Sequence, residues 1–366
     1  MAYTTIDDPS AYFQTKIYSG DGNDDRNITY DGNSDMQPDW LWFKRRNQAV
    51  NHILFDSTRG VTKRNHTNNT NAEATEANFL QAFNSNGFQV GTDADINGSG
   101  GTYVSWGWKA NGGTTSSNTD GSITSTVQAD TTAGFSIVTY TGTGSTATVG
   151  HGLGVKPSVI IIKARTEPTG GVHFGTDQGN WIVYHQGTAS DPETDVLLLN
   201  LNNAVSDTTG HMNDTAPTSS VFTIHTNVDV NESSDTYVAY CFAEKQGYSK
   251  FGSYTGNGST DGPFVYLGFK PAWVMIKKSS GADSWIILDD KRTDTGGKTN
   301  PVDKVLYADS NTSEYDESLG VDFLSNGFKY RDTGGWGGGT SGAKYIYLAF
   351  ASSPLVGSDG TPTTAR

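Results

Sequence analysis

Pro38-Asp-Trp-Leu-Trp-Phe-Lys44 consists of a proline, one polar residue, four apolar residues and a lysine. The pattern returns at Pro157-Ser-Val-Ile-Ile-Ile-Lys163 and at Pro271-Ala-Trp-Val-Met-Ile-Lys277. Continuous apolar runs rich in aromatic and β-branched residues are typical of strands buried on both faces. Proline is tolerated at a first strand residue, and the lysine is expected to carry its charge back to water. The three runs therefore predict one domain type, repeated three times around a buried core strand.

Further strand and turn signals surround each core strand in the same order. Tyr103-Val-Ser-Trp-Gly-Trp-Lys109 alternates between two unlike sets of residues, which is the period of a strand. Ser85-Asn-Gly-Phe88 and Ser325-Asn-Gly-Phe328 are identical, and Asn-Gly between apolar runs predicts a hairpin with a type I′ turn. Strands this frequent predict an all-β chain of three tandem antiparallel β-sandwich domains, of the jelly-roll or immunoglobulin-like kind.

The repeat sets the predicted domain boundaries. A Gly-, Ser- and Thr-rich linker between the first two repeats has the composition of a flexible tether. Short helices are expected only at Asn71–Leu80 and Ser313–Leu319. The predicted parts are an N-terminal lead (1–16), repeat 1 (17–110), the linker (111–137), repeat 2 (138–244), repeat 3 (253–352) and a C-terminal tail (353–366).

The charge balance argues against nucleic acid as a partner. The net charge is −14 and the isoelectric point about 4.8, so a phosphate backbone would be repelled. The most basic group of residues is expected to be a solvated face; it comprises Lys44, Arg45, Arg46, Arg59, Lys63 and Arg64. No apolar stretch approaches the length of a membrane helix, and the first residues lack the basic and apolar regions of a signal peptide. The sequence therefore predicts no membrane insertion and no secretory signal.

The potential metal ligands do not form a recognisable site. Cys241 is the single cysteine, which excludes an internal disulfide and a cysteine-based zinc site, and its apolar neighbours predict a buried side chain. His173 and His185 flank Trp181 without a third ligand. Asp21-Gly-Asn-Asp-Asp25 and Asp93-Ala-Asp-Ile-Asn97 lack the spacing of a calcium loop. We expect neither a metal nor a cofactor.

Catalytic motifs are also missing from the sequence. It contains no Gly-x-Ser-x-Gly elbow and no Cys/His arrangement, and nothing singles out two carboxylates as a glycosidase pair. The chain is therefore predicted not to be an enzyme. Gly334-Gly-Trp-Gly-Gly-Gly339 is followed by no Gly-Lys-Ser/Thr, so it is not a phosphate loop. It is either a hairpin tip or a loop whose Trp336 stacks on a sugar ring or enters a neighbouring subunit.

Five stretches carry a resemblance to a known family, and these are Tyr3–Gln14, Gln37–Arg46, Leu54–Gly60, Ser85–Phe88 and Tyr103–Lys109. They resemble a domain found in structural proteins of marine tailed bacteriophages, a family labelled as of unknown function, tail-fibre or lectin-like. The resemblance is strongest over residues 1–110 and implies a virion protein of β-sandwich modules, without catalytic residues to carry over. Repeats 2 and 3 lack the Phe-Asp-Ser-Thr-Arg-Gly run of the first repeat, although Asp289 keeps the place of Asp56.

This resemblance implies a location in the virion and other virion proteins as partners. The leading expectation is a tail fibre or adhesin that contacts the host surface, including its glycans, while the lead (1–16) anchors it to the virion. The alternative is a capsid or tail-tube decoration protein, and a carbohydrate-active enzyme is a weaker one. A homo-oligomer is expected, and a trimer is one such arrangement.

Overall fold

The computed structural model describes residues 3–167, 179–293, 300–331, 333 and 339–363. Its only helical elements in these ranges are η1 (Pro9–Ala11), α1 (Ala94–Asn97) and α2 (Val228–Asn231), and none of them is long and apolar enough to cross a membrane. The strands form several antiparallel sheets. The prediction of an all-β, antiparallel chain is thus confirmed at this level.

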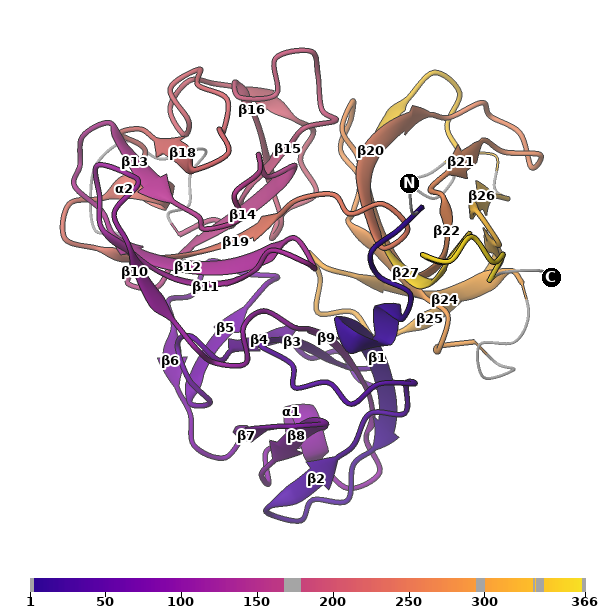
Figure 1. The fold of residues 1–366 in the computed structure, drawn as a ribbon. Coiled ribbons are helices and arrows are strands. Elements are labelled where there is room, and N and C mark those ends of the chain that lie inside the picture. The colour runs from indigo at the N-terminus through magenta and orange to yellow at the C-terminus, as the bar shows by residue number, and fades with distance from the viewer. Residues whose placement is uncertain (1–2, 168–178, 294–299, 332, 334–338, 364–366) are drawn as a thin grey trace.

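The strands fall into three successive groups, which we call units 1, 2 and 3 (Figure 1). Unit 1 (13–110) contains β1 (Phe13–Ser19), β2 (Arg26–Ile28), β3 (Trp40–Arg45), β4 (Ile53–Asp56), β5 (Lys63–His66), β6 (Ala74–Thr75), β7 (Leu80–Asn84), β8 (Gly87–Val90) and β9 (Thr102–Trp108). Six of these form a sheet in the order β1-β9-β3-β4-β5-β6, and β2-β8-β7 form a second one.

Unit 2 has an eight-stranded and a two-stranded sheet, whereas the eight strands of unit 3 form a single sheet. Unit 2 (116–243) contains β10 (Ser116–Asn118), β11 (Ser125–Asp130), β12 (Phe135–Thr141), β13 (Ala147–Gly150), β14 (Val159–Ala164), β15 (Ile182–His185), β16 (Asp195–Leu198), β17 (Ser206–Asp207), β18 (Val221–Ile224) and β19 (Thr236–Phe242). Unit 3 (249–354) contains β20 (Ser249–Thr255), β21 (Phe264–Tyr266), β22 (Phe269–Lys278), β23 (Ile286–Asp289), β24 (Val302–Tyr307), β25 (Tyr315–Leu324), β26 (Gly327–Tyr330) and β27 (Lys344–Pro354).

The three predicted core strands are β3, β14 and β22. Each pairs on both sides, with β9 and β4, with β19 and β15, and with β27 and β23 respectively. The apolar residues of all three are buried on both faces, as the continuous runs predict.

The inner faces of the three large sheets meet in one shared core, around which the units are arranged in Figure 1. Trp40 of unit 1 lies 4.9 Å from Tyr240 of unit 2, and Trp108 of unit 1 lies 5.5 Å from Trp273 of unit 3, between ring centroids. Each unit has a second core on the outer face of its large sheet. The prediction of three tandem domains is therefore incomplete. The units do not bury only separate cores, because tryptophans from all three pack in the shared one.

Three local predictions are wrong. The linker predicted as a flexible tether contains β10 and β11, and β11 pairs with β12 along its length. The two predicted short helices overlap the strands β6, β7 and β25. The Asn-Gly hairpins exist, but the positive φ of the first lies at Gly87 (109°), which is already the first residue of β8 and does not form half of a type I′ turn. A side chain at Gly87 would meet the carbonyl oxygen of Ile28, at 2.0 Å from its Cβ.

The described parts of the N-terminal lead and of the C-terminal tail lie together on unit 3 (Figure 1). The Tyr3 hydroxyl donates to the Gly268 carbonyl (2.8 Å), and the backbone N–H of Ser358 donates to Asp7 (2.6 Å). The lead therefore crosses unit 3 before it enters β1 of unit 1.

Candidate functional site

The units meet at three joints, which we name joint 1–2, joint 2–3 and joint 3–1. At each joint, the strand that follows the core strand ends in a residue directed at the neighbouring unit. The three residues at this position are Asp56, His185 and Asp289, which pair with Trp40, Val159 and Trp273 respectively. A second set of residues faces them across the joints from the closing strands β9, β19 and β27. Each stands two residues before the closing-strand partner of Trp40, Val159 or Trp273. The set consists of Trp106, Tyr240 and Leu348. The joints are thus built from equivalent positions.

Joint 1–2 holds a buried network of charges. The Arg59 guanidinium lies 2.5 Å from the Asp56 carboxylate and 2.8 Å from Glu73, and the Arg59 and Asp56 side chains are fully buried. From unit 2, Arg165 donates to Glu73 (2.9 and 3.0 Å) and the Tyr240 hydroxyl donates to Asp56 (2.7 Å). Burial acts to raise the pKa of Glu73, but the two arginines hold it below its ordinary value.

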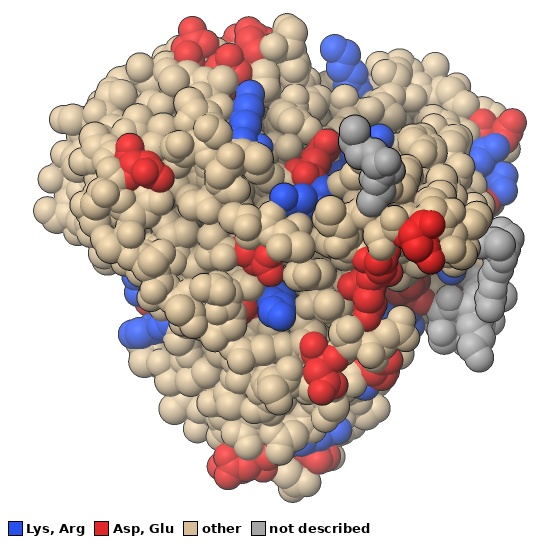
Figure 2. Space-filling model, viewed as in Figure 1, with Lys and Arg blue, Asp and Glu red and all other residues tan. Residues whose placement is uncertain are grey.

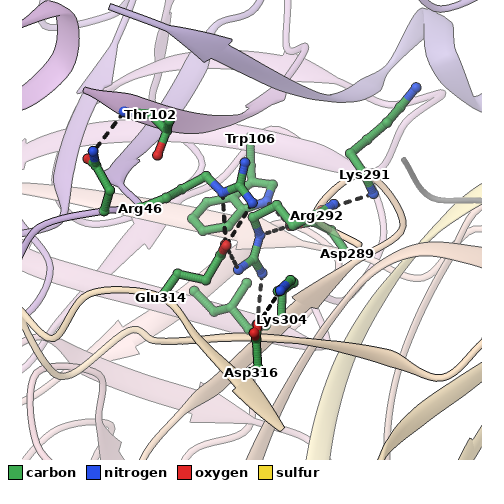
Figure 3. Close-up of polar contacts among 11 residues, drawn as sticks. Arg46, Thr102, Trp106, Asp289, Lys291, Arg292, Lys304, Glu314 and Asp316 are labelled. Carbon is green, nitrogen blue, oxygen red and sulfur yellow. Dashed lines mark hydrogen bonds and ion pairs between the residues drawn. The ribbon is translucent and has the colours of Figure 1, made fainter. Parts of the chain in front are cut away.

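Joint 3–1 repeats this network with other residues, as Figure 3 shows. Arg292 lies 2.5 Å from Asp289 and 2.9 Å from Glu314, and both Arg292 and Asp289 are fully buried. From unit 1, Arg46 pairs with Glu314 at 2.7 Å and the Trp106 indole N–H donates to Asp289 at 2.9 Å. The two joints therefore use one geometry, with Trp106 in the place of Tyr240.

Joint 2–3 closes without this network. His185 stands at the aspartate position, and its Nε2 lies 3.1 Å from the Tyr347 carbonyl oxygen. Burial lowers the pKa of His185 to about 4, so its ring is neutral near pH 7. Thr188 and Val205 stand where joint 1–2 has Arg59 and Glu73, and the Val205 N–H donates to the Ser279 carbonyl (2.9 Å), as Glu73 does to Arg165. The same backbone closure thus occurs with a neutral set of side chains.

These joints correct the interpretation of the basic residues as a solvated face. Arg59 is fully buried, and Lys44 is 1% exposed. On the face drawn in Figure 2, basic side chains lie in small groups among acidic ones. The sequence carried an unused signal, because Asp56-Ser-Thr-Arg59 and Asp289-Asp-Lys-Arg292 share Asp-x-x-Arg at the same place in their repeats.

The lysines that end the core strands are also buried, contrary to prediction. The Lys44 ammonium donates to the Gln48 carbonyl, Lys163 to Ala164 and Lys277 to Lys278. Lys163 and Lys277 also reach the preceding unit, at the carbonyls of Thr70 (3.4 Å) and Asn202 (3.3 Å). Burial lowers the pKa of each lysine to about 8.

We expect stability to rise with pH between about 7.5 and 9, below the range in which the buried tyrosines and Cys241, whose pKa values burial raises, oppose the rise. The folded lysines release protons near pH 8, whereas the ordinary lysine pKa is 10.5, so the unfolded chain binds more protons in this window. Each lysine contributes at most about 1.4 kcal/mol per pH unit. Urea denaturation midpoints from pH 7.5 to 9 measure the slope. The Lys44→Met/Lys163→Met/Lys277→Met variant should flatten it, and an undiminished slope in that variant would contradict this assignment.

An open cleft of about 230 Å³ lies at joint 3–1, beside the charge network. Asp31 on its wall pairs with Lys16 (3.0 Å) and Lys291 (3.5 Å). Burial, with a smaller effect of Asp289, raises the pKa of the Asp290 carboxyl to about 7. The lining residues are Ser10, Phe13, Gln14, Thr15, Asp31, Gly32, Asn33, Ala272, Asp290, Lys291, Ala351 and Ser352.

A second candidate site is an aromatic face on the edge strand β21. Phe264 and Tyr266 are 45% and 49% exposed, while Val265 between them points inward. Tyr266 borders a shallow cleft of about 390 Å³ that also includes Tyr3 and Lys250. The Lys250 ammonium lies 5.4 Å from the centre of the Tyr266 ring. This face combines exposed rings with charged and hydrogen-bonding groups.

One family model matches residues 8–354, and it describes a domain of unknown function, DUF7483. The chain belongs to this family. The DUF7483 match spans all three units, as the shared core leads one to expect of a single structural entity. A search of curated proteins finds no match. The function of this DUF7483 domain has therefore to be argued from its two candidate sites.

The site residues considered from the sequence have mixed outcomes. Trp336, the candidate ligand-binding residue, lies outside the described residues, as does His173. His185 is buried in joint 2–3, and Cys241 is buried, as predicted. Within the described ranges, no group of three or more His, Cys, Asp or Glu side chains is placed to hold a metal ion. The aromatic pair on β21 was missed because Phe264-Val-Tyr266 has the composition of an ordinary strand.

Proposed function

We propose that this DUF7483 domain is a non-enzymatic structural component of a bacteriophage virion, and that it acts as an adhesin of the tail-fibre type. In this proposal its three units are small β-sandwich modules that the shared core joins into one rigid body. The exposed pair Phe264 and Tyr266 carries the proposal, since large exposed rings flanked by polar groups mark a binding surface. The partner class is a host surface glycan, whose rings stack on such side chains.

The position of the lead changes one detail of the expected adhesin. Tyr3 contacts unit 3 and lines the same cleft as Tyr266. Burial and a hydrogen bond with Tyr266 raise the pKa of Tyr3 to about 12. The described part of the lead thus supports the aromatic face and does not extend away from it as an anchor.

Cell binding tests the aromatic face directly. We expect Phe264→Ala/Tyr266→Ala to weaken binding to host cells, and to the glycans that compete for it, at least tenfold, or about 1.4 kcal/mol. The melting temperature should stay nearly unchanged, because both side chains are about half exposed. Val155→Ala is the matched control, since Val155 is 44% exposed on unit 2. Equal binding by both variants would remove this face from the proposal.

Immunogold labelling of intact virions separates the adhesin from the alternative of a decoration protein. Gold at the tail supports the adhesin, whereas gold spread over the head supports capsid decoration. The proposal further expects homo-oligomers, trimers among them, which light scattering of the purified chain measures.

A further inference from the structure

The strands β1, β12 and β20 occupy equivalent places in the three units and share one register, but they differ at their outer edges. β1, β12 and β20 each pair on the inner side with the closing strand of their unit. At the same position of each strand stand Thr15, Ile137 and Phe251, opposite Trp106, Tyr240 and Leu348. What covers the other side of this position differs from one unit to the next.

In unit 2 the edge is covered by another strand. β11 pairs with β12 and places Gln128 opposite Ile137. The buried Gln128 side chain enters joint 1–2, where its amide nitrogen donates to the hydroxyls of Ser57 (2.9 Å) and Thr58 (2.8 Å). Its amide oxygen accepts from the Gly113 N–H (2.7 Å).

In unit 3 two side chains replace that strand. The Phe251 N–H donates to the Glu244 carboxylate (2.8 Å), and the Gln186 amide donates to the Phe251 carbonyl (2.8 Å). Gln186 also donates to Glu244 (3.1 Å). The outward N–H and C=O of Phe251 are therefore both satisfied.

In unit 1 the corresponding edge is open within the part of the chain that the structure describes. β1 is the last strand of its sheet, so no described strand lies beside the outward edge of Thr15. This is the edge that Glu244 and Gln186 cover at Phe251. The Thr15 hydroxyl is buried and has no hydrogen-bond partner among the described residues. Thr15 lines the cleft at joint 3–1 together with Asp290, which stands at the position of Ser57 and Gln186.

We propose that this cleft binds an extended segment of a partner protein, which pairs with β1 at Thr15 and directs a hydrogen-bond-donating side chain, as Gln128 does, toward Asp290. An extended peptide supplies both the acceptor and the donor that an open strand edge requires, and strand addition is an established mode of peptide recognition. The volume of the cleft suits a short segment and not a folded domain.

The described ends of the chain are committed elsewhere. The lead and the tail are held on unit 3 by the contacts of Tyr3 with Gly268 and of Asp7 with Ser358. The proposal assigns the segment to another protein, and in it the cleft is an attachment surface separate from the aromatic face. The inference rests on the edge of β1 alone and stands whether or not β21 binds glycans.

A peptide copied from β11 is the probe, Thr124-Ser-Thr-Val-Gln-Ala-Asp-Thr131, titrated into the full chain by calorimetry and NMR. We expect saturable binding, with chemical-shift changes at Thr15 and Asp290. Replacing the peptide's Gln128 by Ala should weaken binding at least fivefold, and this arm requires no change to the protein. Failure to bind up to about 1 mM, or shifts confined to other surfaces, would overturn the proposal.

Two protein variants sharpen the test. Asp290→Gln/Ser352→Glu installs at the cleft the Gln186 and Glu244 pair that closes the edge of β20. Ser352 is equivalent to Glu244, because each stands two residues after the closing-strand residue that pairs with the core strand, Phe350 or Phe242. This variant should lose peptide binding at least tenfold. Asp290→Ser copies joint 1–2 and should bind within about threefold of the original chain. Equal binding by both variants would place the peptide outside the cleft, and retained melting temperatures exclude unfolding as the cause of a loss.

Discussion

Trp273→Ala should lower the free energy of unfolding by about 3–5 kcal/mol and shift the melting of all three units together. Trp273 is 1% exposed and lies in the shared core. Its ring centroid is 5.5 Å from Trp108 and 6.4 Å from Phe13, both in unit 1. The cavity left by its removal would therefore be lined by two units, and neither could collapse into it alone.

Differential scanning calorimetry with hydrogen exchange of the individual units measures this effect. The expected result is one transition, shifted as a whole, with faster exchange in β9 of unit 1 as well as in β22. Tyr266→Ala serves as the control, because it removes an aromatic side chain from unit 3 that is 49% exposed. A separate early transition of unit 3, with unit 1 unchanged, would show that the shared core does not couple the units.

The three core strands were predictable because their signal is local. A run such as Trp40-Leu-Trp-Phe43 has apolar residues on both faces, and only a central, covered strand tolerates that. The apolar run shows that both faces of the strand are covered, but it does not show which part of the protein covers each face. The outer face of β3 packs within unit 1, whereas its inner face lies in the core that unit 1 shares with units 2 and 3. The shared core is therefore a property of how the repeats close, which no single repeat encodes.

Charged residues misled the prediction for the same reason. Asn71–Leu80 has helix-forming residues, but Leu80 is buried within unit 1, and Glu73 pairs with Arg59 of its own unit and with Arg165 across joint 1–2. Tertiary contacts of this kind outweigh a propensity of a few tenths of a kcal/mol per residue. Similarly, Lys44 is buried because neighbouring carbonyls accept from its ammonium group, and those carbonyls are recognisable only in the folded chain.

Arg59→Thr should destabilise the chain by about 3–5 kcal/mol near pH 7. The substitution removes the cationic partner of Asp56 and one of the two partners of Glu73. The fully buried Asp56 carboxylate then keeps the Tyr240 hydroxyl as a donor but has no positive charge beside it. Most of this loss comes from leaving a buried carboxylate without a compensating charge. The ion pair itself contributes less to the free energy of unfolding, because its attraction is largely offset by the hydration that both charges lost on burial. Urea denaturation at constant pH measures the loss.

Joint 2–3 supplies the control for this prediction from within the same chain. Asp56→His/Arg59→Thr/Glu73→Val gives joint 1–2 the His185, Thr188 and Val205 set, which closes the same backbone without a buried ion pair. Arg165 is left without Glu73, but its side chain is already 24% exposed and can be hydrated. We therefore expect the triple variant to recover at least half of the stability lost in Arg59→Thr, although it carries two more substitutions. A triple variant less stable than Arg59→Thr would mean that the charge network itself, and not the avoidance of an unpaired carboxylate, holds units 1 and 2 together.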